Sequence, residues 1–396
     1  MKINHIKKKD IVVILGLLAA IFFWAYIWTN HHFEVKKKWW YVQYPFVKRT
    51  IQCSEHAPLF MYDLMAYTLK NQKSMSNQLV YVTPTGVVYH CESGWEDGFL
   101  GDVPVTENSR FIYASVSKVV TAAMVIDLVN QGKIQLDQKL VDIIHIPEPK
   151  DQRIKNITVR MLLEHSAGFD RFRTYTPMLT RGKKPWCPTN IEYLSRVTLD
   201  FEPNTEFQYS NVGYCLLGAI TEQVTGQPFR EAVEARYHIA KRDIRFIDQN
   251  ILPDEIQYDH RNEIVYGKDW RKDFDFKDSL SAVGGLSGSA KQMALLAKHM
   301  LAEKPLNILS RSEQPCAINL SEGCYGFAME PYQRKRSDFT VYNKSGYFPG
   351  VETDIFVDDL GGVLTIFRGA TTPARSSLAD FRKHIYDQLF THYNVK

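Results

Sequence analysis

The stretch Phe111-Ile-Tyr-Ala-Ser-Val-Ser-Lys-Val-Val-Thr-Ala-Ala123 decides the fold of this chain. Its apolar run continues to about Gln131 and stops at Gly132, which predicts a buried helix with the glycine just past its C-terminus. Ser115 and Lys118 then lie about one turn apart on the same face. Because S-x-x-K is a common pattern, on its own it is more typical of a helix cap followed by a solvent-directed lysine.

Two further short patterns follow, and each of the three occurs once in the chain. Tyr209-Ser-Asn211 directly precedes an apolar helical run, and Lys344-Ser-Gly346 follows a β-branched and aromatic run. Alone, the first is typical of a core tyrosine with a helix-capping asparagine, and the second of a solvated strand end. Three such patterns in one order, each in a fitting local context, indicate one assembled site.

The residue types in these motifs predict nucleophilic catalysis. A serine hydroxyl is a weak nucleophile until a base takes its proton. The apolar neighbours of Lys118 should desolvate its ammonium and lower its pKa, which makes a neutral amine available beside Ser115. Tyr209, held near an ammonium, is expected to ionise more easily and to act as base or proton relay. Asn211 is expected to hold a substrate amide or carbonyl.

The third motif predicts substrate binding along a strand. Lys344 supplies positive charge for a substrate carboxylate, and Ser345 supplies a hydroxyl. Gly346 removes a side chain where a substrate must lie against the strand. The free N–H groups at the start of the helix that carries Ser115 suit an oxyanion.

These motifs resemble those of the serine β-lactamase and penicillin-binding protein superfamily, and most closely its class C β-lactamase-related serine hydrolase branch. The segments that carry the resemblance are residues 111–123, 157–168, 207–218, 284–287 and 344–350, within a stretch of roughly 56–390. The resemblance implies an acyl-enzyme on Ser115, with Lys118 and Tyr209 as the base system and no cofactor. It also implies substrate binding by Asn211 and Lys344, and an oxyanion hole formed by the backbone N–H groups of Ser115 and Tyr347.

Substrates implied by the resemblance are peptidoglycan-type peptides with D-amino acids, β-lactams and small esters. Lys344 stands where many esterase-like relatives have histidine, which favours a carboxylate-bearing peptide or amide. A carboxylesterase is the nearest alternative, and a non-catalytic protein that binds cell-wall fragments is the alternative of another class. Tyr347 is bulky where a small residue is frequent. No glutamate is assigned to deacylation, so Tyr209 and Lys118 would have to serve that step.

The order of elements predicts an α+β fold, an antiparallel sheet completed by the two ends of the chain and flanked by helices, with a helical region inserted. The expected strands are the hairpin 78–92 and segments 338–343, 351–357 and 362–367, and the expected helices span about 115–131, 158–165, 212–224, 289–302 and 376 onward. His165 falls at the end of one such helix and is expected to be a hydrogen-bonded core residue rather than a catalytic one.

The N-terminal region predicts a membrane anchor. Residues 11–28 read IVVILGLLAAIFFWAYIW, 18 uncharged residues that as a helix span about 27 Å, close to one hydrocarbon core. A cleaved signal peptide is the alternative, but its apolar stretch is usually shorter and ends in small residues, whereas here the far end is aromatic. Lysines flank both sides, so charge hardly decides orientation; an exported catalytic domain is chosen for its chemistry.

The chain is therefore divided into a cytoplasmic segment 1–10, a transmembrane anchor 11–28, a basic and aromatic juxtamembrane linker 29–55, and a hydrolase domain 56–396. A net charge of +4 without a long basic stripe argues against nucleic acid. The expected partners are a small-molecule or peptide substrate and the membrane.

The cysteine pattern is compatible with an oxidising compartment. Cys53 can reach Cys91 if their segments pair, and Cys316 with Cys324 can close a short loop. Cys215, in an apolar helical run, is expected to be a buried small hydrophobe. No Cys/His spacing suggests a metal site.

Overall fold

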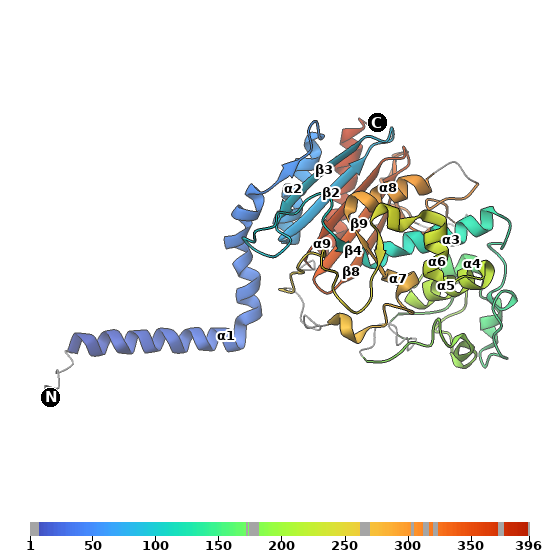
Figure 1. Cartoon of the computed structure of the whole chain (residues 1–396), viewed down its shortest axis with the longest axis horizontal. Helices are drawn as coiled ribbons and strands as arrows, with labels where there is room; N and C mark the ends of the chain where they lie inside the picture. The colour runs from blue at the N-terminus through green and yellow to red at the C-terminus, as the bar shows by residue number, and fades with distance from the viewer. Residues whose placement is uncertain are drawn as a thin grey trace.

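The computed structural model describes residues 8–171, 173, 182–261, 270–301, 305–311, 317–319, 324–370 and 376–394. One long helix, α1, projects from a rounded domain in which helices cover both faces of a sheet (Figure 1). The sheet has seven strands in the order β1 (Gln52–Cys53), β3 (Val88–Gly94), β2 (Ser76–Val82), β10 (Val363–Arg368), β9 (Val351–Asp358), β8 (Thr340–Phe348) and β7 (Glu330–Gln333).

Every pairing in this sheet is antiparallel, and the two ends of the chain meet at its centre. β2 pairs with β3 through the predicted hairpin, whose turn has Gly86 at a φ of 92°. On its other side β2 pairs with β10, with Val82 opposite Val363. The predicted antiparallel α+β sheet completed by both ends of the chain is therefore confirmed.

One face of the sheet is covered by α2 (Leu59–Gln72) and α9 (Ser376–His392), which come from the two ends of the domain sequence. Strands present alternate residues to each face, so Leu79 and Ile366 meet these helices, as does Phe356. Phe381 and Ile385 lie on the predicted apolar side of α9 and are fully buried. This layer forms one hydrophobic core of the domain.

The other face of the sheet packs on α8 (Ala290–Met300) and on the inserted helical region. That region contains α3 (Ser117–Asn130), α4 (Val159–Leu163), α5 (Asn211–Thr225), α6 (Phe229–Tyr237), α7 (Ser281–Gly284), the 3₁₀ turns η1 (Ala114–Val116), η2 (Leu140–Asp142), η3 (Gln152–Asn156), η5 (Ile191–Arg196), η6 (Ile239–Arg242) and η7 (Trp270–Asp273), and a small sheet of β4 (Phe111–Ile112), β6 (Leu286–Gly288) and β5 (Arg245–Phe246). All residues of α3 from Ser117 to Leu128 are buried, because the helix is apolar on every side and lies at the centre of this region.

The predicted helix ends are also confirmed. Thr158 caps α4 by accepting a hydrogen bond from the Met161 amide, and Ser289 caps α8 in the same way. Gly226 ends α5 in the left-handed conformation, where the absence of a Cβ removes the steric cost.

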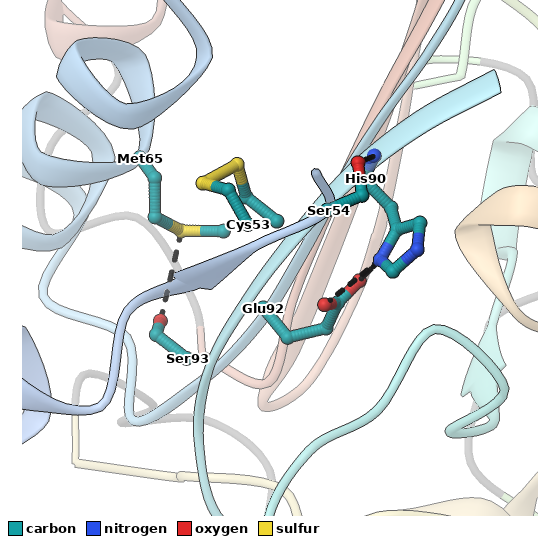
Figure 2. The surroundings of a disulfide bond; sticks show 7 residues. Cys53, Ser54, Met65, His90, Glu92 and Ser93 are labelled. Carbon is teal, nitrogen blue, oxygen red and sulfur yellow. Dashed lines mark hydrogen bonds and ion pairs between the residues drawn. A yellow bond between two sulfur atoms is a disulfide. The ribbon is translucent and has the colours of Figure 1, made fainter. Parts of the chain in front are cut away.

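Two disulfides have both cysteines within the described residues, and one of them corrects a prediction. Cys53 bonds Cys91 and so fastens β1 to β3, as the sequence suggested; Figure 2 shows it beside the side chains of His90 and Glu92. Cys215 bonds Cys187, so the prediction that Cys215 is only a buried small hydrophobe is wrong. The helical pattern gave its burial correctly but could not show that a distant loop brings Cys187 to it.

Cys324 is disulfide-bonded as well. Cys316, the partner that the sequence suggested for it, lies outside the described residues.

Helix α1 (Lys8–Arg49) is bent at His31, which has non-helical backbone angles. The limb before the bend is apolar and points away from the domain, and the limb after it runs along the side of the domain (Figure 1). Trp40 and Val47 of the second limb are buried against the domain. The stretch expected to be a linker, residues 29–55, is thus helical up to Arg49.

Candidate active site

Ser115 lies in η1, just before α3 begins, and Lys118 lies in the first turn of α3. The Lys118 Nζ donates to Ser115 Oγ at 3.1 Å and to the carbonyl oxygen of Val283, on α7, at 2.7 Å. Lys118 is fully buried. Burial lowers the pKa of Lys118 well below its ordinary value, and the positive charges of Lys344 and Arg171 lower it further. The buried position therefore shifts Lys118 towards the neutral amine beside Ser115.

Tyr209 approaches the same hydroxyl from the loop before α5. Its phenol donates to Ser115 Oγ at 2.9 Å, so Ser115 Oγ lies between Lys118 and Tyr209. Burial raises the pKa of Tyr209 and outweighs the opposing effects of the Ser115 hydrogen bond and of Arg171. The expectation of an easily ionised phenol is therefore wrong: desolvation exceeds the attraction to nearby cations.

Asn211 is the first residue of α5 and follows Tyr209 closely. Its Oδ1 is buried and has no hydrogen-bond partner among the described residues. An unpaired buried acceptor is costly, and a substrate N–H group would satisfy it.

Lys344 lies on β8 and is directed into the protein. Its Nζ donates to the Tyr325 hydroxyl at 2.6 Å and lies 4.5 Å from the centre of the Tyr209 ring. The side chain is buried, and desolvation is the main reason why its pKa falls to about 7, with Glu330 opposing this change. The Lys344 amine therefore lies beside the Tyr209 ring inside the protein rather than in solvent.

The three residues of the Lys-Ser-Gly motif do not share a face of β8. Lys344 pairs with Ile355 and Gly346 with Thr353, on the face that packs against the helical region. Ser345 points to the opposite face, where its hydroxyl donates to Asp354 and accepts from Arg382 of α9. The structure therefore does not bring the Ser345 hydroxyl to Ser115, because successive strand residues alternate between faces.

Gly346 allows β8 to contact η1. A Cβ at this position would stand 2.8 Å from the Ser115 backbone nitrogen and 2.5 Å from both the Tyr113 carbonyl oxygen and Thr353 Oγ1. The backbones of the two elements can approach only because this residue has no side chain. Tyr347, the next residue, carries a side chain that is 46% exposed, so its bulk is directed outward at the edge of the site.

Three aromatic rings and a histidine form the floor of the site, and sequence reasoning singled out only two of these residues. His165 lies 4.5 Å from Tyr209, 4.9 Å from Tyr214 and 4.7 Å from Tyr325 between ring centres. The Ser210 amide donates to its Nδ1, which confirms His165 as a hydrogen-bonded core residue. Tyr325 lies outside the motif segments, and Tyr214 lies in the segment 207–218 without an assigned role. Only the aromatic character of these two residues could have suggested burial.

Arg171 is the other residue that sequence reasoning missed. Its guanidinium lies 5.5 Å from the centre of the Tyr209 ring, and its side chain is exposed. Burial lowers the pKa of both Lys118 and Lys344, so Arg171 supplies the more persistent positive charge near Ser115. No group of three or more His, Cys, Asp or Glu side chains in the described ranges is placed to hold a metal ion.

In this fold a serine, a lysine and a tyrosine meet where the sheet contacts the helical region, and this arrangement agrees with the family that the comparisons identify. The chain belongs to the Beta-lactamase family, whose model matches residues 68–351. Over 388 residues it is 47% identical to the probable fimbrial assembly protein FimD, serogroup H1, of Dichelobacter nodosus, covering 98% of both chains.

Two other relatives are more distant. A putative D-alanyl-D-alanine carboxypeptidase of Escherichia coli K12 is 30% identical over 169 residues, which cover 40% of this chain and 38% of that protein. The D-amino acid amidase from Ochrobactrum anthropi SV3, in its complex with L-phenylalanine, matches with a TM-score of 0.64 and 18% identity over 84% of this chain and 98% of that chain. The second is a likeness of fold.

Proposed function

We propose that this protein is a membrane-anchored serine hydrolase that forms an acyl-enzyme on Ser115. The observation that carries the proposal is the position of Ser115 Oγ, 3.1 Å from the Lys118 amine and 2.9 Å from the Tyr209 phenol. A buried neutral lysine can take the serine proton as Oγ bonds to the substrate carbonyl carbon. The protonated lysine and the phenol then return a proton to the leaving group, and water reverses the sequence to release the acid.

The backbone N–H groups of Ser115 and Tyr347 are proposed to bind the oxyanion. The close contact of η1 with β8 at Gly346 supports this assignment, since it brings the two backbones together. Such donors stabilise the charge that develops on the carbonyl oxygen. Asn211 is proposed to accept a substrate N–H group, because its Oδ1 lacks a partner among the described residues.

The substrate is proposed to be a peptide or amide that bears a carboxylate, as in a DD-peptidase, a D-amino-acid amidase or a β-lactamase. The positive charge of Arg171 beside Tyr209 supports this choice. Because Lys344 is buried and bonded to Tyr325, we assign the direct contact with the carboxylate to Arg171, whose side chain is exposed above Tyr209. Lys344 contributes through its charge at short range.

The first experiment is the intact mass of the full chain, in detergent, after incubation with penicillin. The expected result is an adduct of one penicillin that is absent from Ser115→Ala. The full chain is used because Trp40 and Val47 are buried against the domain, so removal of α1 would expose part of its core. The absence of any adduct, with penicillin intact, would move the proposal to the carboxylesterase alternative.

A second experiment separates peptide from ester substrates. Lys344→Ala and Arg171→Gln should reduce the turnover of a carboxylate-bearing D-peptide far more than that of a neutral ester of similar size. A neutral ester makes no use of a cation, so its loss should be small. Equal losses on both substrates would favour a carboxylesterase.

The relationship to a probable fimbrial assembly protein favours a second candidate role, in assembling surface fibres. It also supports a periplasmic or surface location for the domain. In this role the fold would bind a partner or a cell-wall fragment without needing chemistry. A strain lacking the gene distinguishes the two: restoration of fimbriae by Ser115→Ala would favour a scaffold, and failure of that variant at normal protein levels would favour the hydrolase.

A further inference from the structure

The second limb of α1, residues 32–49, is built into the catalytic domain. Trp40 and Val47 are 1% and 0% exposed, and Gln43 between them is 5% exposed. These positions recur at helical spacing, so they form one side of the limb. The Arg261 guanidinium lies 5.2 Å from the centre of the Trp40 ring and holds this side further. The limb is therefore a fixed part of the domain rather than a tether.

The other side of the same limb is apolar and exposed. Trp39, Val42 and Phe46 lie at helical spacing and are 53%, 49% and 44% exposed. A neighbouring loop extends this side, because Phe99 contacts Phe46 with 5.9 Å between ring centres, and the adjacent Leu100 is 58% exposed. Isolated exposed apolar residues need no explanation, but large aromatic ones gathered on one side of a helix mark an interaction surface.

The charge on this limb is predominantly positive. Its basic residues are Lys36, Lys37, Lys38, Lys48 and Arg49, and its acidic residue is Glu34. A helix with exposed aromatic residues among basic ones is suited to the interface of an anionic membrane, where aromatic rings lie at headgroup level and cations meet phosphates.

The direction of the two limbs places this surface. The first limb carries the candidate span Ile11–His31, which is not buried in the protein. The bend at His31 then turns the chain, so that the second limb runs crosswise to the first (Figure 1). If the first limb crosses a bilayer, the second must leave the membrane along its surface.

We propose that the exposed side of residues 32–49, together with Leu100, lies in the headgroup region of the leaflet from which the first limb emerges. The occupant is a phospholipid bilayer that contains anionic lipid. Continuity with the candidate span and charge complementarity select it over a protein partner. The inner side of the limb grips the domain through Trp40 and Val47, so the membrane contact fixes the catalytic domain in one orientation above the surface. This inference rests on the proposed membrane anchor and is independent of the hydrolase chemistry.

The test is photo-crosslinking of the full chain in vesicles of phosphatidylethanolamine and phosphatidylglycerol. The crosslinking residue p-benzoylphenylalanine replaces Trp39 or Phe46 in separate variants. It replaces Leu18 as the control for the span and Tyr193, an exposed aromatic of the helical region, as the control for the domain surface. Mass spectrometry measures the lipid adducts. We expect adducts at Leu18, Trp39 and Phe46, several-fold more than at Tyr193.

Each other outcome decides against the inference in a distinguishable way. Lipid adducts at Leu18, with positions 39 and 46 no higher than position 193, would keep the anchor and overturn the interfacial limb. Crosslinks from positions 39 and 46 to a second copy or another protein would assign this side to a protein contact. A lack of lipid adducts at Leu18 would remove the anchor and the inference together, while the penicillin adduct on Ser115 would still report on the hydrolase.

Discussion

Lys118 reaches Ser115 from inside the protein, and that direction sets its chemistry. Its amine is enclosed by the start of α3 and by α7, and its Nζ bonds the Val283 carbonyl oxygen at 2.7 Å. A neutral amine can still donate its hydrogens to a carbonyl oxygen and to a hydroxyl oxygen. Loss of the Lys118 proton therefore leaves neither of these acceptors unpaired. The role of Tyr209 follows by contrast, since its raised pKa keeps it a proton donor.

Replacing Lys118 with methionine should lower the rate of Ser115 acylation by about 100- to 10,000-fold, because a general base in this position contributes that much. In the unmodified protein acylation should also fall as pH drops through the lowered pKa of Lys118, since the ammonium form has no lone pair. Stopped-flow or mass-resolved acylation rates measure both effects.

Lys298→Met is the matched control. Lys298 lies on α8, and its Nζ donates to the carbonyl oxygens of Pro84 and Gly361 rather than to Ser115. Comparable losses in the two variants, or an unchanged acid limb of the pH profile in Lys118→Met, would remove Lys118 from the base position.

Glu92 gives a prediction for stability. Burial raises its pKa from 4.5 to about 7, opposed by the neighbouring His90, whose Nδ1 lies 3.0 Å from its carboxylate (Figure 2). The folded state therefore binds the proton more tightly than the unfolded state does. Stability should fall as pH rises from about 4.5 to about 7 and then level off, since the unfolded carboxyl ionises first.

Glu92→Gln removes this ionisation. The variant should be more stable than the unmodified protein by on the order of 2 kcal/mol near pH 8, and the difference should shrink near pH 4.5. Denaturant unfolding at both pH values measures it, with the exposed Glu55→Gln as control. A gain that is equal at both pH values would contradict the argument.

At the scale of elements, β8 directs Lys344 and Gly346 towards the site and Ser345 towards the opposite face of the sheet. Gly346→Ala should push β8 away from η1, because the new Cβ would meet two backbone atoms and the Thr353 hydroxyl. A displacement of this kind costs about 100-fold in acylation rate. Ser345→Ala, on the opposite face, should keep acylation within a few-fold while the loss of its bonds to Asp354 and Arg382 costs about 1 kcal/mol of stability.

These two variants distinguish the backbone contact between β8 and η1 at Gly346 from a contact of the Ser345 hydroxyl with substrate. Acylation rates and thermal unfolding of both variants provide the measurement. A large acylation loss in Ser345→Ala with normal stability would restore the original prediction that this hydroxyl binds substrate.

The elements were predictable where local rules decide them. The predicted segments 351–357 and 362–367 correspond to β9 and β10, the predicted helices 158–165 and 289–302 to α4 and α8, and the hairpin 78–92 to β2 and β3. The sheet order was predictable in outline, since strands at both ends with helices between them leave few closed sheets.

The rest of the site depends on packing between distant segments. Tyr325 and Arg171 stand in no motif, yet one bonds Lys344 and the other lies over Tyr209. The Cys187–Cys215 disulfide was not predicted, because spacing does not fix which cysteines meet. The pKa direction of Tyr209 was mispredicted because a nearby cation is visible in a sequence and the depth of burial is not.

In the whole molecule the domain lies at one end of a bent helix. The proposed anchor allows the side of the membrane on which the domain lies to be tested. A reporter enzyme active only outside the cytoplasm, fused after the carboxyl end, should be active, because the proposed substrates and the disulfides belong to an oxidising compartment. The matched fusion at the amino end should be silent. The reverse pattern would put the domain in the cytoplasm and contradict the proposed orientation.

The pairing of β2 with β10 also dictates when the molecule becomes competent. In the proposed orientation export would proceed from the amino end, so Ser115, Lys118 and Tyr209 would emerge long before Lys344. Strand β2 would then wait for a partner that is made near the end of the chain. Until then its apolar edge is open to wrong pairings, a hazard that favours a chaperone during translocation. A chain cut short before β10 would carry Ser115 without a completed sheet, so we expect the proposed hydrolysis to begin only after the last strands have paired.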